Sequence, residues 1–264
     1  MRSASVVGVA MLMLCAGCGK KEVPPARTTA QNPVATTSRP AASGPRTGTA
    51  RVTGKVIFKG RPRPAKKIDM SADAHCVVLS DAVRVDEKFI YAAGEAEGTL
   101  TIGNVFVWIK EGLPAGPYAV PEESVILDQR GCRYVPRVLG IMVGQKLQIV
   151  NSDPTMHNVH SLAKNGRQFN NGMAKGSPPL VKTFQNPEVL LKIKCDAHPW
   201  MSGYAGVVEH PFFAVTGADG GFALENLPAG TYEVAAMHEL LNGSVRTVTV
   251  GDGESVEIEV VLTK

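Results

Sequence analysis

The sequence lacks the features that mark several common protein classes. No convincing amphipathic helical pattern occurs after the N-terminal segment, which argues against a helical bundle. No Ser-His-Asp arrangement, paired-carboxylate motif or glycine-rich phosphate loop is recognisable, so we expect no enzyme in its own right. Charged residues make up only 20% of the chain and the net charge of +4 comes largely from the N-terminal arm, so charge does not indicate nucleic-acid binding.

Short apolar runs broken by glycine and proline fill most of the chain instead. The 264 residues, 44% of them hydrophobic, suffice for one large or two modest domains. Candidate strands cover residues 52–58, 89–91, 104–110, 125–127, 134–139 and 147–150, with more around 180–184, 189–194 and 204–208. Many short strands at regular spacing predict an all-β fold, a β-sandwich or barrel.

The N-terminus has the pattern of a secretory signal. Arg2 precedes an apolar run over residues 4–14, and the small residues Ala16 and Gly17 follow it. The run is too short to span a membrane comfortably, whereas a charged start and a small-residue cleavage site are typical of an export signal. We therefore expect an exported protein.

The Gly-Cys ending of this signal resembles the bacterial lipoprotein signal. The resemblance implies that residues 1–17 are removed and that Cys18 carries lipid, which would anchor the protein to a membrane on the periplasmic side or at the cell surface. A plain secretory signal with a free Cys18 is the alternative. Residues 18–50 are rich in Pro, Thr, Ala, Ser and Arg without an apolar period, which predicts a disordered linker.

The cysteine count is odd once the signal and the lipid are set aside. Five cysteines occur, at positions 15, 18, 76, 132 and 195. In an oxidising compartment, three remaining cysteines suggest one pair and one thiol with another role. Cys195 has His198 and Met201 beside it, so we expect a Cys76–Cys132 disulfide and a Cys195 thiolate. The alternative pairs Cys195 with one of the other two.

Three soft or borderline metal donors lie within one short loop. Cys195, His198 and Met201 have the spacing C-x2-H-x2-M and directly follow the strand predicted at 189–194. A Cys, a His and a weak Met ligand form most of a blue-copper site, which needs one more imidazole. His157, at the start of a predicted strand, is the candidate. Met is a poor zinc ligand, which argues against a structural zinc site.

At these residues the sequence resembles the cupredoxins, with a ligand loop similar to that of amicyanin and a wider pattern similar to methylamine-utilisation-type proteins. The motifs that carry the resemblance, over roughly residues 100 to 240, are Gly131-Cys132-Arg133-Tyr134-Val135-Pro136, Val143-Gly144-Gln145, Asn151-Ser152-Asp153, His157-Asn158-Val159 and the loop from Cys195 to Met201. The combination is specific, although each motif alone is weak.

The resemblance implies one mononuclear type 1 copper centre that transfers electrons. His157, Cys195 and His198 would be its trigonal ligands and Met201 its long axial ligand. Asn158 would tie the two ligand loops together from behind the ligands.

Two features near the motif leave questions open. The resemblance implies an aromatic residue two positions after Asn158, but this sequence has His160 there, which leaves open a second histidine near the site. Pro199 and Trp200 would stiffen the loop and offer an apolar face to a redox protein partner.

The alternative function is copper binding and handling, or a cell-surface binding module without redox activity. A binuclear copper centre is disfavoured because position 199 is Pro and supplies no second loop cysteine.

The C-terminal part has a different pattern. Asp219-Gly220-x-Phe222 followed by Leu227-Pro-x-Gly230-x-Tyr232 resembles the carboxypeptidase-regulatory or transthyretin-like β-sandwich. We therefore expect a Greek-key cupredoxin-like domain over 51–209 and a small sandwich over 210–264. Thr53-Gly-Lys-Val56 resembles the opening strand of the same small module, so the first strand, 51–60, is a candidate to pack with it.

Overall fold

The structure is a computed structural model that describes residues 47–61, 63–79 and 84–264. The expected signal and Cys18 lie outside the described residues. The described chain begins within the expected linker, yet Gly48 already donates a backbone hydrogen bond to the carbonyl of Asn226 at 2.8 Å. The folded part therefore starts a few residues before position 51. Within the described residues, no helix has the length and apolar character to span a membrane.

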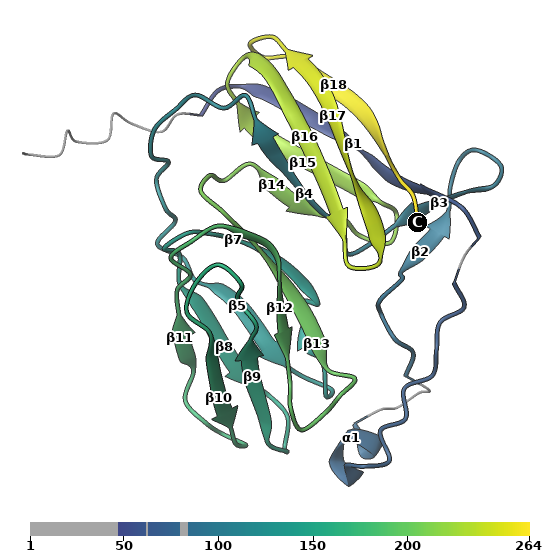
Figure 1. Ribbon diagram of the computed structural model, residues 1–264, viewed down its shortest axis with the longest axis vertical. Helices are drawn as coiled ribbons and strands as arrows, with labels where there is room; N and C mark the ends of the chain where they lie inside the picture. The colour runs from purple at the N-terminus through teal and green to yellow at the C-terminus, as the bar shows by residue number, and fades with distance from the viewer. Residues whose placement is uncertain (1–46, 62, 80–83) are drawn as a thin grey trace, which may run out of the picture. The chain divides into compact units, whose positions relative to one another are not determined.

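The predicted all-β class is confirmed. The described chain forms strands β1 to β18 and one short helix, α1 (Ala74–Val78) (Figure 1). The strands belong to four sheets, which close around two main hydrophobic cores. These are two β-sandwiches, which we call the inserted and the outer sandwich.

The inserted sandwich consists of the strands from β5 to β13. One sheet has the order β11 (Leu180–Lys182), β8 (Leu147–Asn151), β5 (Val125–Gln129) and β6 (Tyr134–Val135). The other has the order β10 (Phe169–Met173), β9 (His157–Ser161), β12 (Glu188–Lys194), β13 (Ser202–Val208) and β7 (Val138–Met142). Alternate residues point inward. The core between the sheets includes Leu127, Ile149, Val159, Ile193 and Val207.

The outer sandwich combines strands from both ends of the described chain. One sheet has the order β15 (Gly221–Leu227), β1 (Ala50–Lys59), β3 (Thr99–Ile102) and β2 (Tyr91–Ala93), with β18 (Ser255–Leu262) also paired to β1. The other has the order β14 (Phe213–Val215), β4 (Phe106–Glu111), β16 (Gly230–His238) and β17 (Leu241–Val250). The buried residues of this core include Val52, Ile109, Phe222, Val234 and Val260.

The expected domain over 51–209 includes strands that belong to the C-terminal module, whereas its expected end at residue 209 does lie between β13 and β14. β1 runs parallel to β18 from the pair Arg51↔Ser255 to the pair Phe58↔Leu262, and β4 lies between β14 and β16. The first strand is thus part of the C-terminal module, and so are β2, β3 and β4. The physical reason is burial, because β4 is apolar on both faces and needs a layer on each side. The inserted sandwich interrupts the outer one between β4 and β14.

The two sandwiches contact each other through a small apolar cluster and an ion pair. Phe106 of β4 is fully buried and packs against Val138 and Val208 of the inserted sandwich. Arg137 Nε donates to Glu239 Oε1 at 3.0 Å, and both side chains are less than one-tenth exposed, at 8% and 7%. The contact is therefore specific as well as apolar.

The connection from β1 to β2 contains α1, which lies over one end of the inserted sandwich. Asp73 caps the helix by accepting from the backbone N–H groups of His75 and Cys76 at 2.8 and 3.2 Å. The expected disulfide is present and joins Cys76 to Cys132 in the loop after β5. A helix of one turn is not stable alone, so this covalent link helps to hold it in place.

Candidate metal centre

Three donor side chains, one from the start of a strand and two from one loop, meet at one end of the inserted sandwich. His157 is the first residue of β9, and Cys195 and His198 lie in the loop between β12 and β13. The loop closes on itself, because the Cys195 N–H donates to the Met201 carbonyl at 3.0 Å and the Met201 N–H donates to the His198 carbonyl at 2.9 Å. Both imidazoles and the thiol are buried, with exposed fractions of 0% for His157 and 3% for Cys195 and His198.

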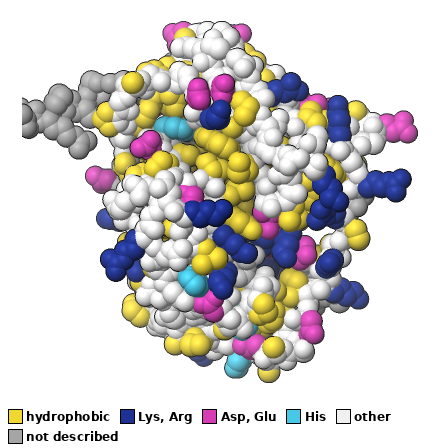
Figure 2. Space-filling model, in the orientation of Figure 1, with side chains coloured by type: hydrophobic (Ala, Val, Ile, Leu, Met, Phe, Trp, Pro, Cys, Tyr) yellow, Lys and Arg dark blue, Asp and Glu magenta, His cyan; other side chains and the backbone are white. Residues whose placement is uncertain are grey.

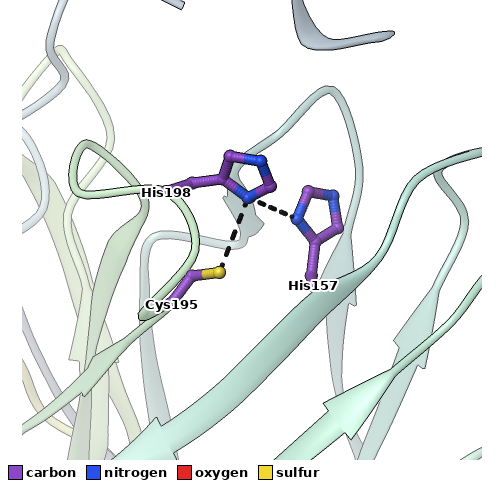
Figure 3. A group of neighbouring side chains, drawn as sticks. All are labelled: His157, Cys195 and His198. Carbon is purple, nitrogen blue, oxygen red and sulfur yellow. Dashed lines mark hydrogen bonds between the residues drawn. The ribbon is translucent and has the colours of Figure 1, made fainter. Parts of the chain in front are cut away.

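The donor atoms of these three residues converge (Figure 3). His157 Nδ1 lies 2.9 Å from His198 Nδ1, and Cys195 Sγ lies 3.6 Å from His198 Nδ1. One donor atom from each residue falls within 4.8 Å of the others. Cys195 is the free cysteine among the described residues. The cluster therefore offers two nitrogens and a sulfur to one point.

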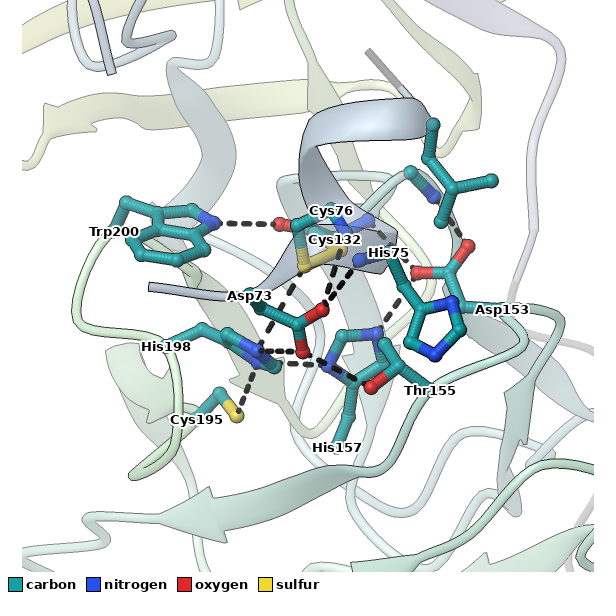
Figure 4. Close-up of a disulfide and its surroundings, with 12 residues drawn as sticks. Asp73, His75, Cys76, Cys132, Asp153, Thr155, His157, Cys195, His198 and Trp200 are labelled. Atoms are coloured by element: carbon teal, nitrogen blue, oxygen red, sulfur yellow. Dashed lines mark hydrogen bonds and ion pairs between the residues drawn. A yellow bond between two sulfur atoms is a disulfide. The ribbon is translucent and has the colours of Figure 1, made fainter. Parts of the chain in front are cut away.

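The outer nitrogen of each imidazole is bound to a carboxylate. His157 Nε2 lies 2.8 Å from Asp153 Oδ2, and His198 Nε2 lies 3.1 Å from Asp73 Oδ2 (Figure 4). Ionised carboxylates only accept, so each Nε2 carries a hydrogen and each Nδ1 is left to face the thiol. Two Nδ1 lone pairs 2.9 Å apart repel each other unless a proton or a metal cation lies between them.

Both carboxylates are themselves held by hydrogen bonds. Asp153 accepts from the N–H groups of Gly131 and Cys132 at 2.7 and 2.8 Å. Burial acts to raise the pKa of Asp153, but these bonds and His157 outweigh burial and lower it. Asp73 also accepts from Thr155 Oγ1 at 3.0 Å. Its hydrogen bonds likewise outweigh the effect of burial and lower its pKa to about 2.

The charge balance of the metal-free cluster favours ionisation of the thiol. Burial acts to raise the pKa of Cys195, but hydrogen bonds with His157, the backbone of Asn158 and His198 outweigh it and lower the pKa to about 7. Burial acts to lower the pKa of His157, but Asp153 and Cys195 outweigh it and raise the pKa to about 9. His157 therefore holds a proton beside the ionised thiol. A metal cation at the same point would be stabilised by the same charges.

Asn158 connects the two ligand loops. Its Oδ1 accepts from the Asp196 N–H at 2.7 Å and lies 3.2 Å from Cys195 Sγ. His160 lies outside the donor cluster, with its Nδ1 3.0 Å from Asp196 Oδ2. Asp196 also accepts from Lys194, at 2.7 Å. The second histidine thus supports the loop residue next to Cys195 and does not join the donor atoms.

The remaining residues of the ligand loop have distinct positions. Met201 is 1% exposed and packs into the same core as Cys195. Pro199 is exposed. Trp200 is half-buried, donates from Nε1 to the Cys132 carbonyl at 3.2 Å, and has its ring centroid 5.1 Å from that of His198. Pro199 therefore faces solvent, whereas Trp200 packs against the disulfide region.

The disulfide borders the cluster on the side of His198. Cys76 Sγ lies 3.7 Å from His198 Nε2, and both disulfide cysteines are fully buried. Neither Asp73 nor Asp153 is identified as a site residue by sequence reasoning. Asp153 stands in the Asn151-Ser152-Asp153 motif four residues before His157, which is a usable signal. Asp73 offers none, because α1 has no amphipathic period.

Comparisons with known proteins give structural likenesses over part of the chain. No family model matches the sequence, and no curated protein matches it. A copper-containing nitrite reductase, NirK from Thermus scotoductus SA-01, is 23% identical, with 38% of this chain and 25% of that chain covered and a TM-score of 0.31. This chain thus spans about a quarter of the reductase.

Two smaller proteins give similar scores. A purple cupredoxin from Nitrosopumilus maritimus is 29% identical, with 28% of this chain and 81% of that chain covered and a TM-score of 0.25. An oxidised amicyanin variant is 23% identical, with 38% of this chain and 97% of that chain covered and a TM-score of 0.30.

Proposed function

We propose that the protein binds one copper ion in a mononuclear type 1 centre and transfers electrons. His157, Cys195 and His198 would be the strong ligands and Met201 the weak axial ligand. The observation that carries the proposal is the convergence of a buried free thiol and two Nδ1 atoms whose imidazoles are fixed from behind by carboxylates.

The donor set fits copper. A thiolate with two imidazoles suits copper better than calcium or magnesium, which prefer oxygen ligands. Ligand atoms held about 2.0–2.3 Å from one ion lie about 3–4 Å apart. The contacts of 2.9 and 3.6 Å within the cluster are close to this range. A cation at this point would also replace the proton that the metal-free cluster holds on His157.

The protein's own residues would keep the centre in one geometry. Copper, when bound, would supply a one-electron couple. Asp153 and Asp73 hold the tautomers of the imidazoles, and Asn158 holds the thiol and the neighbouring loop N–H. Burial excludes water from the donors. Ligands that move little between two oxidation states favour rapid electron exchange, as a preorganised site lowers the cost of rearrangement.

The burial of the donors favours electron transfer over copper delivery. A delivery site must open to a partner that takes the metal, yet His157 and His198 are almost fully buried and each has its outer nitrogen bound to a carboxylate. We expect a bathocuproine disulfonate chelator to remove Cu(I) slowly, over hours. Complete removal within seconds would favour copper handling instead.

The cellular setting is part of the proposal. The export signal, the lipid on Cys18 and the membrane anchor, periplasmic or at the cell surface, come from the sequence pattern and lie outside the described residues. We propose that the chain is not an enzyme in its own right and that its partner is a redox protein.

An absorption titration tests the proposed centre. Purified protein titrated with Cu(II) should develop an intense visible band from thiolate-to-copper charge transfer, with an end point near one ion per chain. Cys195→Ser should abolish the band. His160→Gln is the matched control, because His160 binds Asp196 and lies outside the donor cluster, and it should keep the band. A colourless wild type, or equal copper affinity in Cys195→Ser, would contradict the proposal.

A further inference from the structure

A cleft opens beside Cys195, between the ligand loop and the outer sandwich. Its volume is about 380 Å³, and Cys195 and Pro199 form part of its wall. Three lysines line it, namely Lys88, Lys192 and Lys194. We call this cleft the lysine cleft. Its positive charge and its position beside Cys195 indicate a function.

The acidic residues of the lysine cleft are already neutralised. Asp196 is paired with Lys194 at 2.7 Å, and Glu239 is paired with Arg137 at 3.0 Å. Lys88 and Lys192 are exposed and form no ion pair with any residue in the described part of the chain. Two uncompensated ammonium groups therefore give the lysine cleft a positive potential. Figure 2 shows Lys and Arg side chains gathered across the middle of this face, around a hollow.

The other side of the donor cluster is covered. The outer nitrogens of His157 and His198 are bound to Asp153 and Asp73, and the disulfide lies 3.7 Å from His198 Nε2. α1 lies over these groups (Figure 4). Neither imidazole edge is open to a partner. The lysine cleft, in contrast, reaches the residue that carries the thiol, so the path from the donor cluster to the surface is short there.

We propose that the lysine cleft is the electron-exchange surface of the protein and that it docks the carboxylate-rich surface of a one-electron redox protein. The proposal rests on the proposed function. One electron crosses at each encounter, so that the partner is oxidised as the centre is reduced, or the reverse, and no bond forms or breaks. Opposite charge steers such encounters and accelerates them most at low ionic strength.

Charge reversal of the two unpaired lysines tests the surface. Lys88→Glu with Lys192→Glu should lower the rate at which hexacyanoferrate(III) oxidises the reduced copper protein by roughly tenfold or more at low ionic strength. The rate with the cationic oxidant tris(phenanthroline)cobalt(III) should rise or stay constant. Both differences should shrink as salt is added, because exposed charges are screened.

The matched control carries the same change in net charge elsewhere. Lys59 and Lys146 are exposed and do not line the lysine cleft. Lys59→Glu with Lys146→Glu should leave both rates within about twofold of wild type, since distant charges are screened. An equal fall in the hexacyanoferrate rate for both double variants would overturn the proposal, and so would the absence of any fall.

A polymer probe separates a protein surface from a small anion. Poly-L-glutamate should slow the hexacyanoferrate reaction of the wild type, but not that of the Lys88→Glu, Lys192→Glu variant. Monomeric glutamate at the same carboxylate concentration should have little effect, and equal protection by the monomer would overturn docking of a protein. Each variant is first checked for its visible band. If the copper-loaded wild type shows no band, the copper centre itself is contradicted. If the band is present but the Lys88→Glu, Lys192→Glu variant reacts at the wild-type rates, only the docking surface is contradicted.

Discussion

Two aspartates decide which nitrogen of each candidate ligand histidine faces the thiol. Asp153 binds Nε2 of His157 and Asp73 binds Nε2 of His198, so both rings present Nδ1 to Cys195. Carboxylates behind metal-bound imidazoles fix the ring orientation and raise the basicity of the ligand. In the proposed centre, the two residues would therefore contribute to metal affinity without contacting the metal.

Replacement of either aspartate by asparagine should weaken metal binding. Asp153→Asn and Asp73→Asn remove a negative charge and put an amide beside Nε2, and we expect each to lower copper affinity about 10–100-fold. A competition titration against a chelator measures the change, and the charge-transfer band should shift as the rings turn. The control Asp219→Asn, at an exposed residue of the outer sandwich, should change neither. Wild-type affinity in both variants would contradict this role.

A buried histidine of the outer sandwich should make stability depend on pH. His238 is 3% exposed, and its Nδ1 accepts the N–H of Leu240 at 3.1 Å. Burial and the charge of Arg137 lower its pKa from 6.5 to about 4. Between these values the unfolded chain binds more protons than the folded chain, so the stabilisation is complete above about pH 6.5 and is lost as the pH falls toward 4.

Urea unfolding of the metal-free protein at several pH values measures this effect. The loss attributable to His238 should be at most about 3 kcal/mol, since each pH unit contributes up to about 1.4 kcal/mol per proton. His238→Gln keeps an acceptor but cannot titrate, so its stability should fall less over the same range. A residual slope is expected from His210, whose pKa burial also lowers to about 4. An unchanged slope in His238→Gln would rule out this assignment.

At the scale of elements, α1 and its disulfide position one of the two aspartates. Asp73 is the N-cap of α1, and the Cys76–Cys132 bond ties the helix to the loop whose N–H groups hold Asp153. One covalent bond thus joins the supports of both imidazoles. The helix is too short to stay in place by its own hydrogen bonds.

Removal of the disulfide should destabilise the protein and loosen α1. Closing a loop with a sequence separation of 56 residues is worth about 4 kcal/mol in the chain-entropy description. We expect Cys76→Ser with Cys132→Ser to lower the free energy of unfolding by about 2–5 kcal/mol, measured by urea denaturation. Hydrogen exchange should show faster exchange at the backbone N–H of Leu79, which bonds to the His75 carbonyl. Unchanged stability together with unchanged exchange would contradict this.

Sequence reasoning reaches the parts of the site that are local. Cys195, His198 and Met201 fall within one loop, and His157 follows a strand end, so their closeness is predictable from strand pairing. The bond between Asp73 and His198 spans 125 residues and depends on a helix with no sequence pattern. Long-range contacts of this kind follow from tertiary packing and leave no mark on local periodicity.

The division into sandwiches was less predictable for a related reason. The apolar alternation in residues 52–58 indicates a strand but says nothing about its neighbours. Its partners are β15, β3 and β18, and the parallel pairing with β18 joins the two ends of the outer sandwich. The fold class and the positions of the strands follow from local sequence patterns. The choice of which strands pair with each other does not.

At the scale of the whole molecule, close backbone approach couples the two sandwiches. A Cβ added to Gly206 would lie 2.3 Å from Phe106 Cζ, and one added to Gly140 would lie 2.2 Å from Phe213 Cε2. Both glycines are in neighbouring strands of the inserted sandwich, and both phenylalanines belong to the outer one. The two phenylalanine rings fit only because Gly140 and Gly206 have no side chain.

Gly206→Ala should therefore destabilise the protein by about 1–3 kcal/mol, the usual cost of overpacking a core. Gly172→Ala is the matched control, because a Cβ there meets no atom within 4 Å. Urea denaturation followed by circular dichroism measures both. Phe106→Leu should recover part of the loss when combined with Gly206→Ala. Equal stability of the two alanine variants would contradict the close contact.

The strand order of the outer sandwich also sets an order of assembly during synthesis. β1 emerges first, yet its long partners β15 and β18 follow only after every strand of the inserted sandwich. β5 to β13 need no later strand for their pairing. Because chains fold from the N-terminus as they are made, the inserted sandwich can close around His157, Cys195 and His198 while β1 still lacks β15 and β18, and β4 still lacks β14 and β16. The nascent chain would then carry a complete donor cluster before its outer sandwich exists.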